Sequence, residues 1–322
     1  MRGTVVGVLR GGPSKEHEVS LKSGAAMIAH LPPERFTVRD LYIDKKGTWH
    51  DRGREVSPVD ALRTIDVALI GLHGEYGEDG TVQRLLTQTG VPYAGTDAYG
   101  SHLAMHKALA KAHAREAGLM LARDVLVETL EGAEKGAHEA IRSFRQPVVV
   151  KPVAWGSSVG VSIVGGYLPV YEAIVALFNA GATGVLIEER IIGTEATAGV
   201  VEGLRGEELY SLPPVEIIPP PSAGFFAAHV KYTGDTREIC PGRFSRAVSD
   251  EIQRQAALAH RMLGLRHYSR SDFIVTDKGV YYLETNTLPG LTSESLMPKS
   301  LAAVGVSFPD FLVHLVDLAQ SR

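Results

Sequence analysis

The sequence predicts an α/β fold with two or three domains, and three observations support this. Short apolar segments alternate with longer helix-like segments, which is typical of a parallel sheet covered by helices. The chain has 322 residues, and at about 150 residues per domain this length predicts two or three domains. Hydrophobic residues make up 44% and charged residues 22%. These are globular values, so a disordered chain is excluded.

The first third of the chain has the pattern of a parallel sheet. Apolar strand segments alternate with helical ones, and Gly90 stands where a helix ends. Ligands of such sheets bind beyond the carboxyl ends of the strands, so the loops that begin at Gly11 and His73 are predicted to face a substrate. The segments, in order, are strand Val5–Leu9, helix Ser20–Leu31, strands Thr37–Ile43 and Val67–Leu72, and helix Thr81–Thr89.

The middle of the chain is predicted to begin with one long helix, from about 97 to 117, and to continue as a small α/β domain from about 115 to 190. A glycine- and serine-rich segment, Gly156–Gly160, separates two strands there, and we call it the serine loop. The remaining segments are strands Pro147–Pro152, Val161–Val164 and Val185–Glu189, and helix Leu168–Ala180.

The last third has a mixed pattern. Five prolines predict a rigid, non-helical connector over Pro213–Pro221, and the polar segment Phe225–Pro241 is predicted to be a long loop that acts as a lid. The other segments are an amphipathic helix at Asp250–Leu263, a hairpin of Tyr268–Thr276 and Gly279–Glu284, and a final helix at Phe308–Ala319.

Composition excludes several classes of protein. The 33 basic and 37 acidic residues leave a net charge of −4, which does not favour a nucleic-acid partner. The single cysteine, Cys240, cannot form an internal disulfide or a cysteine-only zinc site. No apolar run approaches 18 residues, so no membrane span is expected. We therefore expect a cytoplasmic protein. Glycine and proline together reach about 16% of the chain, against about 12% on average.

The C-terminal hairpin carries a candidate metal site. Asp272 lies on one strand, and Glu284 and Asn286 share one face of the next because they are two residues apart. Two carboxylates and an amide oxygen are hard ligands that suit Mg²⁺. The alternative is a solvated polar face, but carboxylates within such apolar strands need partners.

Two features predict phosphate binding. Backbone N–H groups in the serine loop can hold phosphate oxygens, although the loop lacks the ending of a Walker A motif and is weak evidence alone. Lys151 ends a strand of valines, where a lysine is costly without an anion. The alternative is a lysine that extends its ammonium to solvent. Lys107, in the long predicted helix, would ordinarily lie on the surface.

Two acidic loops follow predicted strands, Ser14–Glu18 and His73–Gly80. Together they could bind an ammonium group. The alternative is a solvated acidic rim beside a helix N-terminus, where Asp and Glu are favoured.

In combination, these motifs resemble those of the D-alanine–D-alanine ligases, within the ATP-grasp superfamily. The resemblance runs from about Val5 to Ala319, and all its motifs occur in order at similar spacing. They are Gly11-Gly12 with Glu16-His17-Glu18-Val19-Ser20, His73-Gly74 with Gly77-Glu78-Asp79-Gly80, Lys151-Pro152 with the serine loop, Lys231-Tyr232, Arg270-Ser271-Asp272-Phe273 and Glu284-Thr285-Asn286-Thr287-Leu288-Pro289-Gly290.

The resemblance implies roles for individual residues. ATP-binding residues would be Lys107, Lys151, Ser158, Glu188 and Glu195, and the ligands of two Mg²⁺ ions, or of Mn²⁺, would be Asp272, Glu284 and Asn286. Catalytic residues would be Glu16, Ser157, Tyr232, Arg270 and Gly290, with Arg270 and the Gly290 N–H stabilising an oxyanion. Residues near the amino-acid substrates would be His73, Val19, Ser20, Lys231, Ser295 and Leu296.

The resemblance also implies an ATP-grasp fold of three domains, 1–96, 97–190 and 191–322, with two β-rich halves gripping ATP. It implies an enzyme that joins two D-alanines through a D-alanyl phosphate for peptidoglycan synthesis. It further implies a homodimer. Activation by a monovalent cation is a property of such an enzyme to test. Lys231-Tyr232 favours an amine as second nucleophile, since relatives that make an ester carry histidine there.

Two other functions stay open. Departures from the family pattern at His106, Arg84, Thr87, Ala154 and Trp155 leave room for a ligase of the same mechanism that joins other amino acids. A nucleotide-binding protein without ligase activity is disfavoured, because the candidate metal ligands and Arg270 are all present.

Overall fold

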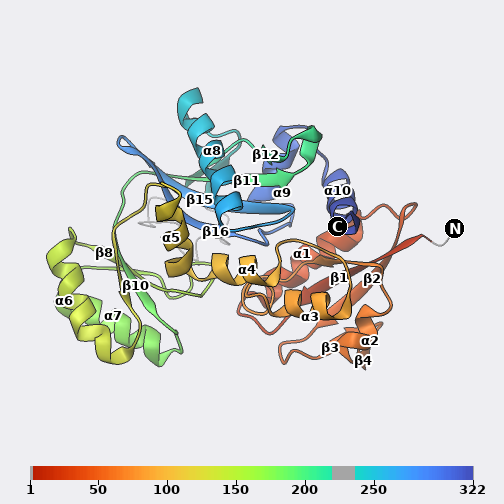
Figure 1. Ribbon diagram of the computed structural model, residues 1–322, viewed down its shortest axis with the longest axis horizontal. Coiled ribbons are helices and arrows are strands. Elements are labelled where there is room, and N and C mark those ends of the chain that lie inside the picture. Colours follow the sequence, from red (N-terminus) through yellow and green to blue (C-terminus); the bar gives the residue numbers. More distant parts are fainter. Residues whose placement is uncertain (1–2, 220–235, 322) are drawn as a thin grey trace.

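The computed structural model describes residues 3–219 and 236–321 as three sheets with their helices. In Figure 1 the four-stranded sheet with its two helices lies at one end of the molecule and the N-terminal sheet at the other, with the C-terminal sheet between them. The predicted α/β class and its separate sheets are confirmed.

The N-terminal sheet has the strand order β4-β3-β2-β1-β5-β6. Strands β2, β1, β5 and β6 are parallel, as predicted, whereas β3 and β4 form an antiparallel edge. The elements are β1 (Thr4–Gly11), α1 (His17–His30), β2 (Phe36–Ile43), β3 (Trp49–Asp51), β4 (Arg54–Val56), α2 (Pro58–Leu62), β5 (Val67–Ile70), α3 (Thr81–Thr89) and β6 (Tyr93–Ala94).

Helix α3 ends as predicted. Gly90 adopts φ +70°, a left-handed conformation that costs glycine little, and its N–H caps the last carbonyls of the helix.

The small domain has an antiparallel sheet in the order β7-β10-β8-β9, with α6 and α7 packed against it. Strand β7 and helix α6 were not predicted. The elements here are α4 (Ala98–Met105), α5 (Lys107–Glu116), β7 (Asp124–Val127), α6 (Ala133–Ser143), β8 (Val148–Pro152), β9 (Ser162–Val164), α7 (Tyr167–Asn179) and β10 (Val185–Glu189), with a short 3₁₀ turn at Leu130–Gly132.

The single long helix predicted for 97–117 is wrong, because the chain breaks at His106 into α4 and α5. His106 has an extended conformation (φ −86°, ψ 93°), and its Nδ1 accepts a hydrogen bond from the N–H of Leu109. The N–H of Lys107 donates to the carbonyl of Val153 (2.7 Å) instead of to the preceding turn. The break therefore ties the start of α5 to the end of β8.

The C-terminal sheet is antiparallel in the order β14-β13-β11-β15-β16, with β12 paired to β11. Its elements are β11 (Thr194–Glu202), β12 (Leu209–Ser211), β13 (Val215–Ile218), β14 (Arg237–Ile239), α8 (Arg246–Met262), β15 (Tyr268–Thr276), β16 (Gly279–Asn286), α9 (Leu296–Ala303) and α10 (Phe308–Gln320), with a 3₁₀ turn at Leu204–Gly206.

Several predictions for this part need refinement. The hairpin of β15 and β16 and the final helix are confirmed, and α8 begins four residues earlier than predicted because Ser245 caps it. The proline-rich connector contains strand β13, and the end of the predicted lid contains strand β14. Lys231 and Tyr232, together with most of that lid, lie outside the described residues. Helix α9 was not predicted.

The C-terminal helix packs on the N-terminal sheet. Phe311, Leu312 and Leu315 of α10 are buried in the same hydrophobic cluster as Val6 and Leu69 of β1 and β5. The two ends of the chain thus share one core. No single helix of the described residues is long and apolar enough to cross a membrane, and α9 and α10, which reach that length together, are bent by 102°.

Candidate active site

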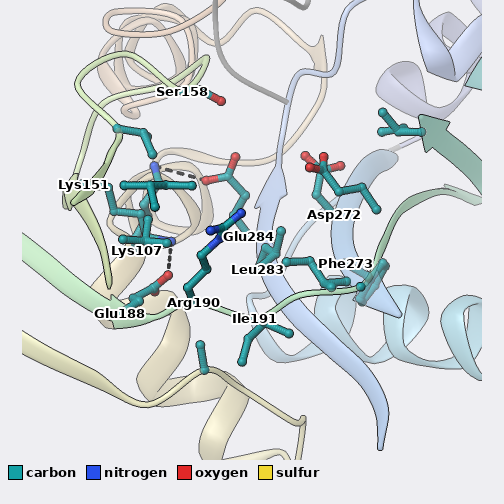
Figure 2. Close-up of a pocket in the computed structure, with 18 of the residues that line it drawn as sticks. Lys107, Lys151, Ser158, Glu188, Arg190, Ile191, Asp272, Phe273, Leu283 and Glu284 are labelled. Atoms are coloured by element: carbon teal, nitrogen blue, oxygen red, sulfur yellow. Dashed lines mark ion pairs between the residues drawn. The ribbon is translucent and has the colours of Figure 1, made fainter. Parts of the chain in front are cut away.

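Two adjoining cavities lie where the sheets meet. The first, which we call the strand cavity, lies between β8 and β10 of the small domain and β15 and β16 of the C-terminal sheet (Figure 2). The second, the loop cavity, lies among the loops that follow β1, β5 and β16 and measures about 730 Å³. That volume is in the range of small-molecule sites. Lys107, Arg270, Glu284 and Leu296 line both cavities.

A buried network of lysines and carboxylates adjoins the strand cavity, which its members Lys151 and Glu188 line. Lys151 of β8 pairs with Glu188 of β10 (Nζ–Oε2 2.8 Å), and Lys111 of α5 pairs with the other oxygen of Glu188 (2.7 Å) and with Asp124 (2.9 Å). Neighbouring strands β8 and β10 carry the first pair, and both side chains are buried.

The network favours the charged forms of Lys151 and Glu188. Burial alone would lower the pKa of Lys151, but the carboxylates of Glu188 and Glu284 outweigh it and raise that pKa. Burial alone would raise the pKa of Glu188, but Lys151 and Lys111 outweigh it and lower that pKa. The strand cavity is therefore lined by fixed charges, which suits a polyanionic ligand.

Lys107 reaches the cavity because of the helix break at His106. Its Nζ donates to the carbonyl of Trp155 (2.7 Å) and lies 3.2 Å from Glu284 Oε2, a pair marked in Figure 2. The side chain is buried although its position is at the start of a helix. The structure therefore brings Lys107 and Lys151, which were predicted to act together, into the same cavity.

The predicted metal ligands do share one face of the hairpin. Asp272 is paired in register with Glu284, and Arg270 with Asn286. Both oxygens of Asp272 accept hydrogen bonds from Arg270 (2.9 Å each), and Asn286 Nδ2 donates to Asp272 Oδ2 (3.2 Å). Asn286 keeps its carbonyl oxygen as an acceptor.

This donor set fits a hard cation. Among the described residues, no group of three or more His, Cys, Asp or Glu could hold a metal ion, so a site here depends on the Asn286 oxygen together with the two carboxylates. Oxygen-only sets of this kind, completed by phosphate and water, are typical of Mg²⁺.

The serine loop lies between the cavities. Ser157 and Ser158 have φ values of 53° and 57°, and Gly160 has φ 76°. Consecutive residues in such conformations turn backbone N–H groups toward one point, which is a common way to bind an anion. Ser158 lines the strand cavity and Ser157 lines the loop cavity.

The loop cavity contains most of the residues predicted to bind amino acids. Glu16, Val19, His73, Gly290, Ser295 and Leu296 all line it. Ser20 lines neither cavity: it is fully buried, and its hydroxyl accepts a hydrogen bond from the N–H of His73 (2.9 Å). In this structure Ser20 therefore positions His73. Glu195 lines the strand cavity.

His73 and Glu78 hold both backbone groups of Leu288. His73 Nδ1 lies 2.9 Å from the Leu288 carbonyl, and the Leu288 N–H donates to Glu78 Oε1 (3.2 Å). This contact joins the N-terminal domain to the loop that carries Gly290. Burial, aided by the charge of Arg270, lowers the pKa of His73 to about 4. Burial, aided by the charge of Glu16, raises the pKa of Glu78.

Sequence reasoning missed Glu78, which lines the loop cavity, and Lys111, which pairs with Glu188 of the strand cavity. Lys111 lies one helical turn after Lys107, among buried alanines of α5, and that spacing was the available signal. Glu78 stands in the motif Gly77-Glu78-Asp79-Gly80, but it was given no role of its own, and nothing local distinguished it from Asp79.

Comparisons with known proteins agree with this geometry. A family model described as "D-ala D-ala ligase C-terminus" matches residues 115–317, and one described as "D-ala D-ala ligase N-terminus" matches residues 5–58 and 50–96. A D-alanine–D-alanine ligase of Syntrophobacter fumaroxidans is 40% identical over 315 residues, which cover 98% of this chain and 97% of the relative.

Solved structures show the same fold. The D-alanine–D-alanine ligase of Bacillus anthracis in complex with ATP superposes with a TM-score of 0.81 at 28% identity, covering 99% of this chain and 98% of the other. The VanG D-Ala:D-Ser ligase of Enterococcus faecalis gives a TM-score of 0.85 at 27% identity, covering 99% and 100%.

Proposed function

This chain belongs to the D-alanine–D-alanine ligase family, and from that premise we propose that it uses ATP to join two molecules of D-alanine for peptidoglycan synthesis. It is an ATP-grasp enzyme of the ligase class. One observation carries the proposal: Lys107, Arg270 and Glu284 line both cavities. A phosphoryl group held at this boundary is in reach of a nucleotide on one side and an amino acid on the other.

The strand cavity is the proposed ATP site. Lys107 and Lys151 would neutralise phosphate oxygens, and Glu188 and Glu195 would bind the adenine and ribose. Two Mg²⁺ ions bound by Asp272, Glu284 and Asn286 would offset the negative charge of the β- and γ-phosphates, with Mn²⁺ as a substitute. Ser158 and the serine-loop backbone would hold the γ-phosphate at the boundary.

The loop cavity is the proposed amino-acid site. Glu16 would hold the ammonium of the first D-alanine. The carboxylate of this D-alanine then attacks the γ-phosphate and displaces ADP. The amine of the second D-alanine then attacks the acyl phosphate, and phosphate leaves as the amide forms. Arg270 and the Gly290 N–H would stabilise the tetrahedral oxyanion, and Ser295 and Leu296 would contact the second D-alanine.

The buried position of His73 limits its part in this chemistry. With a pKa of about 4 the imidazole is neutral at physiological pH, so it can donate one hydrogen bond without adding charge beside Arg270. Its proposed role is to position the Leu288–Gly290 segment next to the first D-alanine. Lys231 and Tyr232, which lie outside the described residues, stay sequence-based predictions for closing the site.

Further parts of the proposal concern the surroundings of the enzyme. We place it in the cytoplasm as a homodimer, with small-molecule substrates and neither nucleic-acid nor membrane partners. Gel filtration with light scattering tests the dimer, and assays in K⁺ against Na⁺ test activation by a monovalent cation.

The direct test is a coupled assay with purified protein, ATP, Mg²⁺ and D-alanine. We expect ADP and phosphate in equal amounts and D-alanyl-D-alanine by mass spectrometry, with L-alanine as the matched control. Absence of the dipeptide at saturating D-alanine would contradict the proposal.

A second candidate function keeps the mechanism and changes the second substrate. It is favoured by Trp155 beside the serine loop and by the likeness to the D-Ala:D-Ser ligase. A panel of D-alanine, D-serine and D-lactate as acceptors, scored by mixed products, separates the two functions. A preference for D-serine would support the second.

A further inference from the structure

Lys15 and Trp155 make a contact that the proposed chemistry does not use. Lys15 follows β1 in the N-terminal domain, and Trp155 precedes the serine loop in the small domain. The Lys15 ammonium lies 3.9 Å from the centroid of the Trp155 ring. This distance is well within cation–π range. Among the described residues Lys15 has no carboxylate within ion-pair distance, although Glu16 and Glu18 are near in sequence.

The Trp155 ring also lies against Gly160, the last residue of the serine loop. A Cβ placed on Gly160 would lie 3.2 Å from Cε3 and Cζ3 of Trp155. The ring therefore lies against the far end of the loop that it precedes. It also packs partly against the hydrophobic cluster of the small domain. The ring therefore restricts the position of Gly160, which follows Ser158 by two residues in the same loop.

The chain neighbours of this pair are residues of the proposed active site. Glu16 follows Lys15, and a Cβ on Gly156, next to Trp155, would lie 2.9 Å from Glu16 Oε2. The Trp155 carbonyl accepts a hydrogen bond from Lys107 Nζ (2.7 Å). Movement of either partner would thus shift groups proposed to bind the first amino acid and the phosphates.

We propose that Lys15 and Trp155 are positioning residues that fix the serine loop against the N-terminal domain, and so set the distance between the γ-phosphate and the first amino acid. The inference rests on the proposed function for what the loop binds. The contact itself is independent of turnover, since it joins two domains in the protein without substrate.

The first test reads the contact by fluorescence. The chain has two tryptophans, so a Trp49→Phe background leaves Trp155 as the only reporter. Lys15→Met, which keeps length and removes charge, is expected to raise the acrylamide quenching constant of Trp155 about twofold. Lys15→Arg should keep the parent value, because guanidinium also stacks on indole. An unchanged constant in Lys15→Met would overturn the proposal.

The second test uses kinetics in the native chain, which does not depend on the Trp49→Phe background. Lys15→Met and Trp155→Leu should each raise KM for the first D-alanine about fivefold, and the double variant should be no worse than either single one. Lys15→Arg should restore the parent KM. Lys45→Met is the matched control, since Lys45 is an exposed lysine of the same domain.

The two tests fail in different ways. Additive effects of the two substitutions, or a fivefold rise in Lys45→Met, would overturn a shared positioning role. A protein that makes no dipeptide but shows the twofold change in quenching would contradict the proposed function and leave the contact between Lys15 and Trp155 established.

Discussion

The strand cavity and the loop cavity adjoin but are built in opposite ways. In the strand cavity, side-chain charges from β8, β10, α5 and β16 pair with one another, as Lys151 and Lys111 do with Glu188. In the loop cavity, side chains hold backbone groups, as His73 and Glu78 do with Leu288.

The difference follows from the ligands that each cavity is proposed to bind. A triphosphate needs several fixed positive charges, and these are stable in a buried site only when carboxylates offset their desolvation. A small amino acid offers few groups to bind, so the protein groups that bind it must be placed accurately. Loops from different domains can do this when side chains hold the backbone of those loops in place. Substitutions in the two cavities should therefore change different properties of the protein.

The largest effect is expected at the boundary between the cavities. Glu284→Gln removes a carboxylate proposed to bind Mg²⁺ and should lower kcat about 10³-fold, equivalent to about 4 kcal/mol of transition-state stabilisation. Thermal unfolding should change far less than turnover, because Glu284 is partly exposed and the Gln side chain keeps an oxygen that can accept a hydrogen bond from Lys107. ADP release measures the loss, with Glu251→Gln, on an exposed face of α8, as the control. Near-normal turnover would contradict a metal role for Glu284.

A substitution beside the strand cavity should lower the free energy of unfolding. Lys111→Met leaves Glu188 and Asp124 with fewer cations in a buried site and should cost about 3 kcal/mol of unfolding free energy. Urea denaturation measures it. Arg115→Met is a matched control, since Arg115 pairs with the same Asp124 oxygen (3.0 Å) but is 60% exposed, and should cost under about 1 kcal/mol. Equal losses would show that burial does not distinguish the two pairs.

In the loop cavity, His73 should make the stability of the protein depend on pH. The pKa of His73 is about 4 in the folded chain and about 6.5 when unfolded. Between these values the unfolded state binds more protons, so stability rises with pH, and at pH 5 His73 should lower it by about 2 kcal/mol relative to pH 7. His73→Gln should remove this part of the slope in urea titrations at pH 7, 6 and 5. His30→Gln, at an exposed site, should not.

The smallest effect is expected where the cavities meet at the serine loop. Gly156→Ala would bring a Cβ to 2.9 Å from Glu16 Oε2, and displacement of that flexible carboxylate should raise KM for D-alanine about tenfold with little change in KM for ATP. Gly165→Ala is the control, since its Cβ would meet only ordinary contacts at 3.8 Å. Equal changes in both KM values would mean that Gly156 serves the two cavities alike.

Much of the site was predictable because its residues occur as local motifs. Asp272, Glu284 and Asn286 could be assigned to one face from the two-residue period of a hairpin, and the register confirms it. Strands and helices with clear endings, such as α3 with Gly90, were also predictable. The helix break at His106 was not, because an Ala- and Leu-rich segment favours an unbroken helix. The contact of Lys107 with Val153 opposes it, and that contact depends on a distant part of the chain.

The sequence by itself determined the α/β class, the order of the motifs and the chemical groups available to bind phosphate, metal and amino acid. Tertiary structure decided which of those groups meet. It buried Lys111 against Glu188, joined His73 and Glu78 to Leu288, and placed Lys15 on Trp155. The reason is physical: local motifs depend on backbone periodicity along the chain, whereas these pairs join residues 77 to 215 positions apart and depend on how the domains pack.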